Sequence, residues 1–89
     1  MLNPSYTRQF ERDLKLMLKR QKRAEKIKEV ITQLVEEVPL EERFRNHKLV
    51  GNYIGRWECH IEPDWLLVYK KAAGEIIFER TGTHSDLFE

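Results

Sequence analysis

The chain has 89 residues, of which 40% are hydrophobic and 35% are charged, and its formal net charge is +1. This length and composition fit one soluble globular domain, residues 1–89, with a modest core. No apolar run reaches 18 residues, which excludes a membrane-spanning helix, and a single cysteine, Cys59, excludes an internal disulfide. We therefore expect a cytoplasmic protein that makes no contact with a membrane.

A short strand and a helix are predicted at the start of the chain. Residues 1–4 are expected to form an edge strand, because Pro4 limits pairing. Apolar residues then recur at intervals of three and four, which predicts a helix from about Thr7 to Arg20, capped by Ser5 or Thr7. The apolar face of this helix consists of Phe10, Leu14, Met17 and Leu18.

A second helix follows after a short join near Gln21–Lys22. The same spacing of apolar residues runs from Ala24 to Val38. Pro39 is expected to end this helix, because the residue before a proline avoids the helical conformation. The short join implies an antiparallel helical hairpin whose apolar faces need cover.

The second half of the chain predicts a small antiparallel sheet that supplies this cover. The segment "RWECHIE" (56–62) alternates, so that Trp57, Cys59 and Ile61 point to one face. The segment "WLLVYK" (65–70) is apolar on both faces, as expected of a central strand. "EIIFER" follows after a hairpin turn at Gly74. Three antiparallel strands packed on two helices make an α+β domain.

Titratable side chains gather at the ends of the predicted strands. His60 lies on the polar face of the first strand beside Glu58, and Asp64 opens the second strand. His84 closes the third strand, and His47 precedes the sheet in a loop. In a meander, the end of the third strand adjoins the start of the second. We therefore expect His84 and Asp64 to meet at one edge of the sheet.

Histidines, a carboxylate and an arginine at one edge can cleave RNA without a metal. A base takes the proton of a ribose 2′-OH, an acid protonates the leaving 5′ oxygen, and a cation such as Arg80 stabilises the charge on phosphorus. Structural alternatives stay open: a turn role for Asp64, a surface salt bridge between Arg80 and Glu79, and an ordinary loop role for His47. Phe88 either docks on the core or stacks on a ligand. A zinc site is disfavoured, because the spacing of structural zinc ligands is absent.

Positive charge is concentrated between Arg12 and Lys28, where eight lysines and arginines stand against two acidic residues. A face of this kind can contact nucleic acid phosphates, and the alternative is a solvated helical hairpin. The residues that we expect to contact RNA are Lys15, Lys19, Arg20, Lys22 and Arg23.

The segments "HKLVGNYIGRWECHIEPDWLLVYK" and "ERTGTHSDLF" closely resemble the YafQ branch of the RelE/ParE superfamily of type II toxins. The resemblance covers nearly the whole chain. It implies a RelE-like fold, with a helical hairpin packed on a small antiparallel sheet. It also implies an endoribonuclease that cuts mRNA in the A site of the 70S ribosome without metal or cofactor, and a cognate antitoxin protein as partner.

The resemblance also implies roles for individual residues. The four implied catalytic residues are His47, His60, Asp64 and His84, and the implied substrate-binding residues are Glu58, Arg80 and Phe88. Asp64 and His84 are expected to be the base and acid pair, with His47 and His60 positioning or polarising the phosphate. The basic helical residues are then expected to contact ribosomal RNA.

The chain departs from the family pattern at several places. Arg56 and Trp57 stand where the family often has an uncharged residue followed by an arginine, and Asp86 and Glu89 add negative charge near the expected phosphate. Two other functions fit the same features: a non-enzymatic, ParE-like inhibitor of DNA gyrase, and a plain RNA-binding module. If the four implied catalytic side chains were far apart in the structure, the nuclease interpretation would be excluded.

Overall fold

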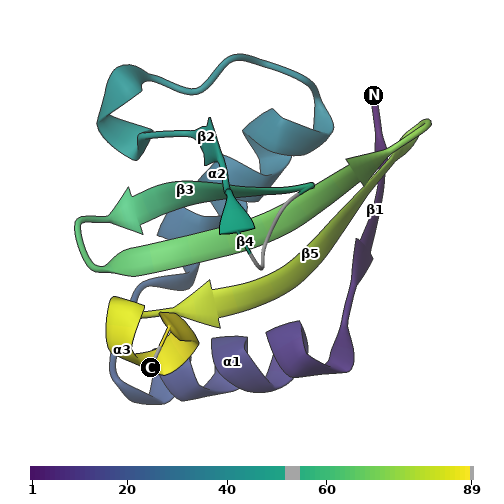
Figure 1. Cartoon of the computed structure of the whole chain (residues 1–89). Helices are drawn as coiled ribbons and strands as arrows, with labels where there is room; N and C mark the ends of the chain where they lie inside the picture. The colour runs from purple at the N-terminus through teal and green to yellow at the C-terminus, as the bar shows by residue number, and fades with distance from the viewer. Residues whose placement is uncertain (52–54, 89) are drawn as a thin grey trace.

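The structure is a computed structural model that describes residues 1–51 and 55–88. Within these residues, five strands form one sheet in the order β1-β5-β4-β3-β2 (Figure 1). The elements in chain order are β1 (Asn3–Tyr6), α1 (Arg8–Lys19), α2 (Ala24–Val35), the 3-10 helix η1 (Glu42–Phe44), β2 (His47–Lys48), β3 (Arg56–Glu62), β4 (Trp65–Ala72), β5 (Glu75–Gly82) and α3 (His84–Phe88). The predicted α+β class is confirmed.

Helix α1 begins where the sequence predicted, because Thr7 caps it. The hydroxyl oxygen of Thr7 accepts a hydrogen bond from the backbone N–H of Phe10 at 3.0 Å. The same hydroxyl donates to the carbonyl of Glu79 at 2.9 Å, which ties the start of α1 to β5. Phe10 and Met17 are buried against the sheet, as their spacing predicted.

Helix α2 ends at Val35, so the predicted extension to Val38 and Pro39 is wrong. The chain leaves the helix through Glu37, which adopts a left-handed conformation with φ of 61°. The N–H groups of Glu37 and Val38 donate to the carbonyls of Leu34 and Gln33 at 3.2 and 2.9 Å. This is a Schellman motif, which satisfies the last helical carbonyls before the proline is reached.

The three predicted strands are confirmed as β3, β4 and β5, and Gly74 forms the turn between the last two with φ of 73°. The edge strands differ from the prediction. β1 runs over Asn3–Tyr6 and pairs with β5 in parallel, so the sheet is mixed. The segment of His47, predicted to be a loop, forms β2 and pairs with β3 so that His47 lies opposite Glu58. A strand of two residues is too short to show the alternation of apolar and polar residues by which a strand is predicted.

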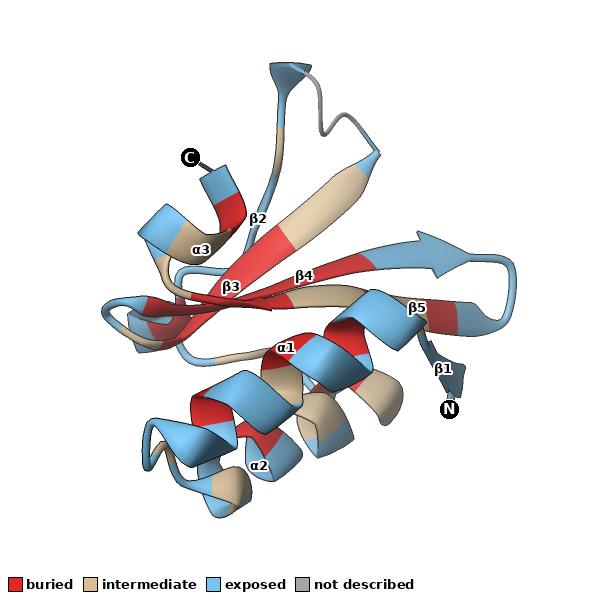
Figure 2. Cartoon of the chain, turned by 90° about the horizontal axis from the view of Figure 1, so that it is seen from below, coloured by how far each residue is buried: buried red, intermediate tan, exposed pale blue. Residues whose placement is uncertain are grey.

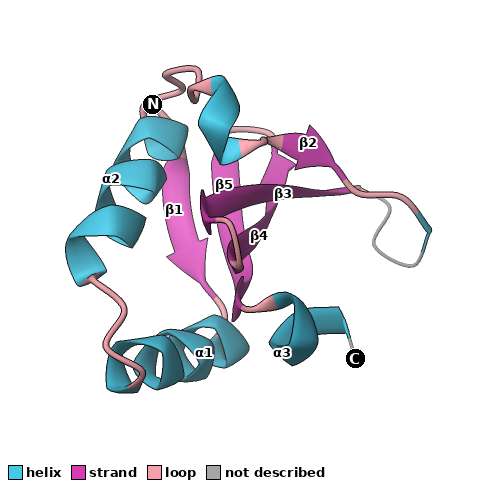
Figure 3. Cartoon of the chain, turned by 90° about the vertical axis from the view of Figure 1, so that its left-hand side faces the viewer, coloured by secondary structure: helices cyan, strands magenta, loops and turns pink. Residues whose placement is uncertain are grey.

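The two faces of the sheet carry different cover. Helices α1 and α2 lie on one face, and α3 lies on the other (Figures 2 and 3). On the helical-hairpin face, Trp65, Leu67 and Phe78 belong to the main core, whereas Leu66 packs with α3 on the opposite face. None of the helices in the described ranges is long and apolar enough to cross a membrane.

Helix α3 was not predicted, and His84 begins this helix instead of closing a strand. Thr83 and Asp86 form a capping box. The hydroxyl of Thr83 accepts from the N–H of Asp86 at 3.1 Å, and the carboxylate of Asp86 accepts from the N–H of Thr83 at 3.0 Å. Leu87 is buried and anchors the helix to the sheet. The box and this single anchor turn the chain back over the end of β5.

Candidate active site

Four aromatic rings form a row on the face of the sheet opposite α1 and α2. The ring centroids of His47 and His60 are 6.4 Å apart, those of His60 and His84 are 5.8 Å apart, and those of His84 and Phe88 are 6.4 Å apart. The rings come from β2, β3 and α3. The structure therefore gathers the histidines that the sequence singled out.

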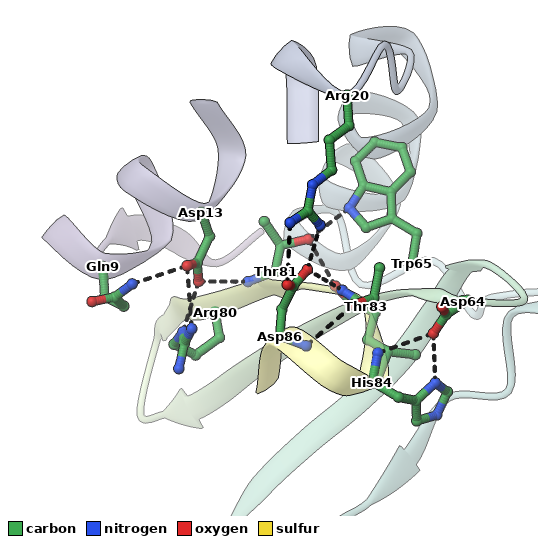
Figure 4. Close-up of polar contacts among 11 residues, drawn as sticks. Gln9, Asp13, Arg20, Asp64, Trp65, Arg80, Thr81, Thr83, His84 and Asp86 are labelled. Atoms are coloured by element: carbon green, nitrogen blue, oxygen red, sulfur yellow. Dashed lines mark hydrogen bonds and ion pairs between the residues drawn. The ribbon is translucent and has the colours of Figure 1, made fainter. Parts of the chain in front are cut away.

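His84 is held by Asp64, which lies in the turn between β3 and β4 (Figure 4). One oxygen, Oδ1 of Asp64, is 2.9 Å from the backbone nitrogen of His84 and 2.8 Å from its ring Nδ1. These bonds, first the backbone and then the ring, lower the pKa of Asp64 below its ordinary value. The ionised carboxylate makes Nδ1 the donor and leaves Nε2 for proton exchange. The predicted meeting of His84 and Asp64 is confirmed.

Glu58 is a buried carboxylate between two of the histidines, with only 5% of its surface exposed. Its Oε1 lies 3.4 Å from Nε2 of His47 and 3.3 Å from Nε2 of His60. The Nδ1 atoms of the two rings face the carbonyls of Arg45 and Pro63, at 2.7 and 3.3 Å, and must donate to them. The Nε2 atoms of both rings therefore face the same carboxylate.

Arg80 lies near the C-terminal end of β5, where its side chain pairs with Asp13 of α1 (Figure 4). The Nε and Nη2 atoms of Arg80 donate to the Asp13 carboxylate at 2.7 and 3.2 Å, and the N–H of Thr81 donates to it at 3.1 Å. The alternative salt bridge of Arg80 with Glu79 is wrong, because Glu79 pairs with Arg56 at 2.6 Å. Sequence spacing held no signal for Asp13, which is separated from Arg80 by 67 positions.

Phe88 lies at the surface, whereas Cys59 lies in the core. Phe88 is 39% exposed beside His84, whereas its neighbour Leu87 docks on the core. Cys59 is fully buried on the opposite face of β3, and burial, with the nearby Glu58 charge, raises its pKa to about 12. Cys59 is therefore a core thiol that points away from the histidine row. Across residues 1–51 and 55–88, no three His, Cys, Asp or Glu side chains are arranged to hold a metal.

The predicted RNA-contacting residues differ in how far they are engaged within the fold. Lys15 and Lys19 are exposed on α1. Lys22 pairs with Glu62 at 2.8 Å, and Arg20 pairs with Asp86, also at 2.8 Å. The remaining residue of the set, Arg23, lies 3.4 Å from Glu25 at the exposed start of α2. Arg20 and Lys22 thus have structural partners within the fold.

The negative charge of Asp86, expected to disfavour a nearby phosphate, is neutralised by Arg20 and by the N–H of Thr83. Both interactions lower the pKa of Asp86, with the backbone bond the larger cause. Glu89, the other acidic residue of that segment, lies outside the described residues. A threonine followed three residues later by an acidic residue is typical of a capping box, so the spacing of Thr83 and Asp86 could have predicted the start of α3.

The sequence and the fold agree with a known class of bacterial toxins. Residues 2–89 match the family model described as "Bacterial toxin of type II toxin-antitoxin system, YafQ". The chain therefore belongs to the YafQ family of type II toxins.

Relatives and solved structures support the same assignment. The chain is 42% identical over 84 residues to the mRNA interferase toxin YafQ of Escherichia coli strain K12, covering 93% of this chain and 91% of the relative. It is similar to YafQ in the E. coli DinJ–YafQ complex, with a TM-score of 0.93, 39% identity and full coverage of both chains. It is also similar to a metal-bound toxin from Helicobacter pylori, with a TM-score of 0.93, 33% identity and coverage of 99% and 100%.

Proposed function

We propose that this chain is a ribosome-dependent endoribonuclease that cleaves mRNA in the A site in the cytoplasm and is held inactive by a cognate antitoxin. The E. coli relative named as an mRNA interferase toxin and the crystallised DinJ–YafQ complex support this reading. The observation that carries the proposal is the double contact of Asp64 with the backbone and ring of His84, inside a row of imidazoles.

His84 is the proton-exchanging residue of the proposed site. Asp64 binds Nδ1 and the backbone N–H, so Nε2 gives its proton to the leaving 5′ oxygen of the RNA. The lowered pKa of Asp64 makes this carboxylate a weak base. We therefore propose that Asp64 orients His84 and does not act as the base that the sequence suggested. The proton of the 2′-OH passes to another imidazole of the row. The 2′ oxygen attacks phosphorus, which yields a 2′,3′-cyclic phosphate and a free 5′-OH.

The charge that develops on phosphorus is met by Arg80, which Asp13 of α1 holds in place. Glu58, whose Oε1 lies within 3.4 Å of Nε2 of both rings, holds His47 and His60 beside the phosphate. Side chains move both protons, so the reaction requires no metal.

The test compares wild type with His84→Gln on purified 70S ribosomes carrying a short mRNA. We expect His84→Gln to bind ribosomes as wild type does and to lose about 10²–10⁴ in the single-turnover cleavage rate. Ser85→Ala, at the next and exposed position of α3, is the matched control and should cleave normally. Cleavage by His84→Gln at the wild-type rate would contradict the proposal.

Assays on the same purified protein distinguish the nuclease from the two other candidate functions. A gyrase inhibitor would leave mRNA intact on programmed ribosomes and would reduce supercoiling by DNA gyrase. A plain RNA-binding module would be insensitive to His84→Gln and would lose activity in a Lys15→Gln, Lys19→Gln double variant. Arg20 is unsuitable for this second test, because its ion pair with Asp86 supports α3.

A further inference from the structure

A pocket of about 350 Å³ lies beside the histidine row, between η1 and the end of β3. This volume falls within the range of about 300–1,000 Å³ that is usual for pockets that hold small ligands. The residues of its wall that bear on binding are Lys26, Arg43, Phe44, Arg45, His60 and Glu62. His60 belongs both to this wall and to the ring row, so the pocket and the proposed active site are continuous.

The pocket is positively charged, because three cations of its wall, Lys26, Arg43 and Arg45, stand against one carboxylate, that of Glu62. The two oxygens of Glu62 lie 2.8 Å from the ammonium groups of Lys22 and Lys26. These two hydrogen bonds lower the pKa of Glu62, and the two lysines outweigh its single negative charge. Arg43 and Arg45 remain as the other cations of the wall.

Arg45 is placed for a ligand by an unusual backbone. Its φ and ψ of 48° and 49° are left-handed, a conformation that is uncommon for arginine. This turn aims its carbonyl at Nδ1 of His47, 2.7 Å away, while its side chain lines the pocket. Among the described residues, the guanidinium of Arg45 has no hydrogen bond or ion pair. Arg43 has partners of its own: its guanidinium lies 4.5 Å from the centre of the Phe44 ring, and its Nη2 lies 3.5 Å from Oε1 of Glu41.

We propose that this pocket, which we call the η1–β3 pocket, binds the nucleotide of the RNA strand that neighbours the phosphate being cut. The guanidinium of Arg45 binds the phosphate of this neighbouring nucleotide. The inference rests on the proposed nuclease function and assigns a neighbouring subsite to it. An arginine fork binds phosphate oxygens in a bidentate manner, which a lysine cannot do. The shared wall at His60 places the two phosphates on one continuous strand.

The binding test uses the intact chain and adenosine 3′,5′-bisphosphate, followed by ¹H–¹⁵N NMR. We expect the probe to shift the amides of residues 43–45 and 60–62. Arg45→Gln should weaken binding about tenfold, equivalent to about 1.4 kcal/mol. Arg8→Gln, a change of an exposed arginine that does not line the pocket, should bind as wild type does.

A second variant separates the side chain from the backbone. Arg45→Gly keeps the left-handed backbone, which glycine adopts readily, and removes the whole side chain with its guanidinium. It should match Arg45→Gln, whereas Arg45→Lys should recover part of the affinity through charge alone. On programmed ribosomes, Arg45→Gln should raise the toxin concentration required for half-maximal cleavage and leave the maximal rate nearly unchanged.

Three results would overturn the pocket assignment. The first is equal affinity of wild type and Arg45→Gln for the bisphosphate. The second is equally tight binding of inorganic phosphate, which would show that no nucleotide is recognised. The third is a loss of antitoxin binding in Arg45→Gln with nucleotide binding intact, which would assign the pocket to an acidic protein segment. A wild type that binds the bisphosphate through Arg45 but does not cleave mRNA would instead contradict the proposed nuclease function.

Discussion

Arg20 of α1 and Asp86 of α3 form an ion pair, with 2.8 Å between Nη1 and Oδ2 (Figure 4). Asp86 also caps α3 through the N–H of Thr83. The pair connects helices that lie on opposite faces of the sheet, past the end of β5. It therefore holds in place the helix that begins with His84, and an acidic residue near the proposed active site becomes part of its support.

The pH dependence of stability should reveal this role of Asp86. Its pKa is lowered below the ordinary 3.8 in the folded state, so its contribution is complete above that value and is lost as pH falls through the native pKa. Asp86→Asn should lower the free energy of unfolding by about 1 kcal/mol at pH 7 and by less at pH 3. Urea denaturation at the two pH values measures this difference. An equal loss at both values would show that the charge of Asp86 is not responsible.

Gly82→Ala should displace α3 while the rest of the fold is retained. An added Cβ would lie 3.0 Å from Cβ of Asp86 and 3.3 Å from Cδ2 of Leu87, so α3 must shift. We expect about 1–3 kcal/mol of destabilisation and a larger relative loss of mRNA cleavage, because His84 moves with α3. Gly74→Ala is the control, since its left-handed turn costs stability at a distance from the histidines. Normal cleavage by folded Gly82→Ala would contradict the placement of α3.

Glu58→Gln keeps the size of the side chain and removes its charge. Without the carboxylate, the Nε2 atoms of His47 and His60 lose their shared charged partner. We expect single-turnover cleavage at neutral pH to fall by about tenfold or more, with an unchanged circular dichroism spectrum. Glu75→Gln, at the exposed start of β5, should cleave normally. If Glu58→Gln also cleaves normally, the charge of Glu58 has no part in the reaction.

Thr81→Val should destabilise the core without altering its shape. The hydroxyl of Thr81 accepts from the indole N–H of Trp65 at 2.9 Å and donates to the carbonyl of Leu66 at 2.7 Å. Valine leaves the buried indole N–H without its partner, which costs about 1–3 kcal/mol. Tryptophan fluorescence during urea denaturation measures the loss. Thr81→Ser retains the hydroxyl and should lose less of the free energy of unfolding. An equal loss in the two variants would indicate that packing of the threonine methyl group, and not the hydrogen bond, accounts for the destabilisation.

The sequence was most informative where the signal is local. The three-and-four spacing around Phe10 and the alternation around Cys59 depend only on neighbouring residues, and α1 and β3 were found where these patterns predicted them. The meeting of Asp64 and His84 could also be deduced, because consecutive antiparallel strands leave one arrangement for their ends. The resemblance of the motifs to the YafQ family needed no coordinates.

Other features depended on partners that are distant in the sequence. No pattern marked Asp13 as the partner of Arg80, or Arg20 as the partner of Asp86, since 67 and 66 positions separate them. The strand at His47 exists because β3 offers it an edge, and α3 exists because Leu87 finds a hydrophobic site on the sheet.

The sequence by itself therefore determined the family, the main elements and the candidate histidines. Only the tertiary structure decided which carboxylate serves which ring. Hydrogen bonds and ion pairs act over about 3 Å, and such distances between remote residues are set by packing.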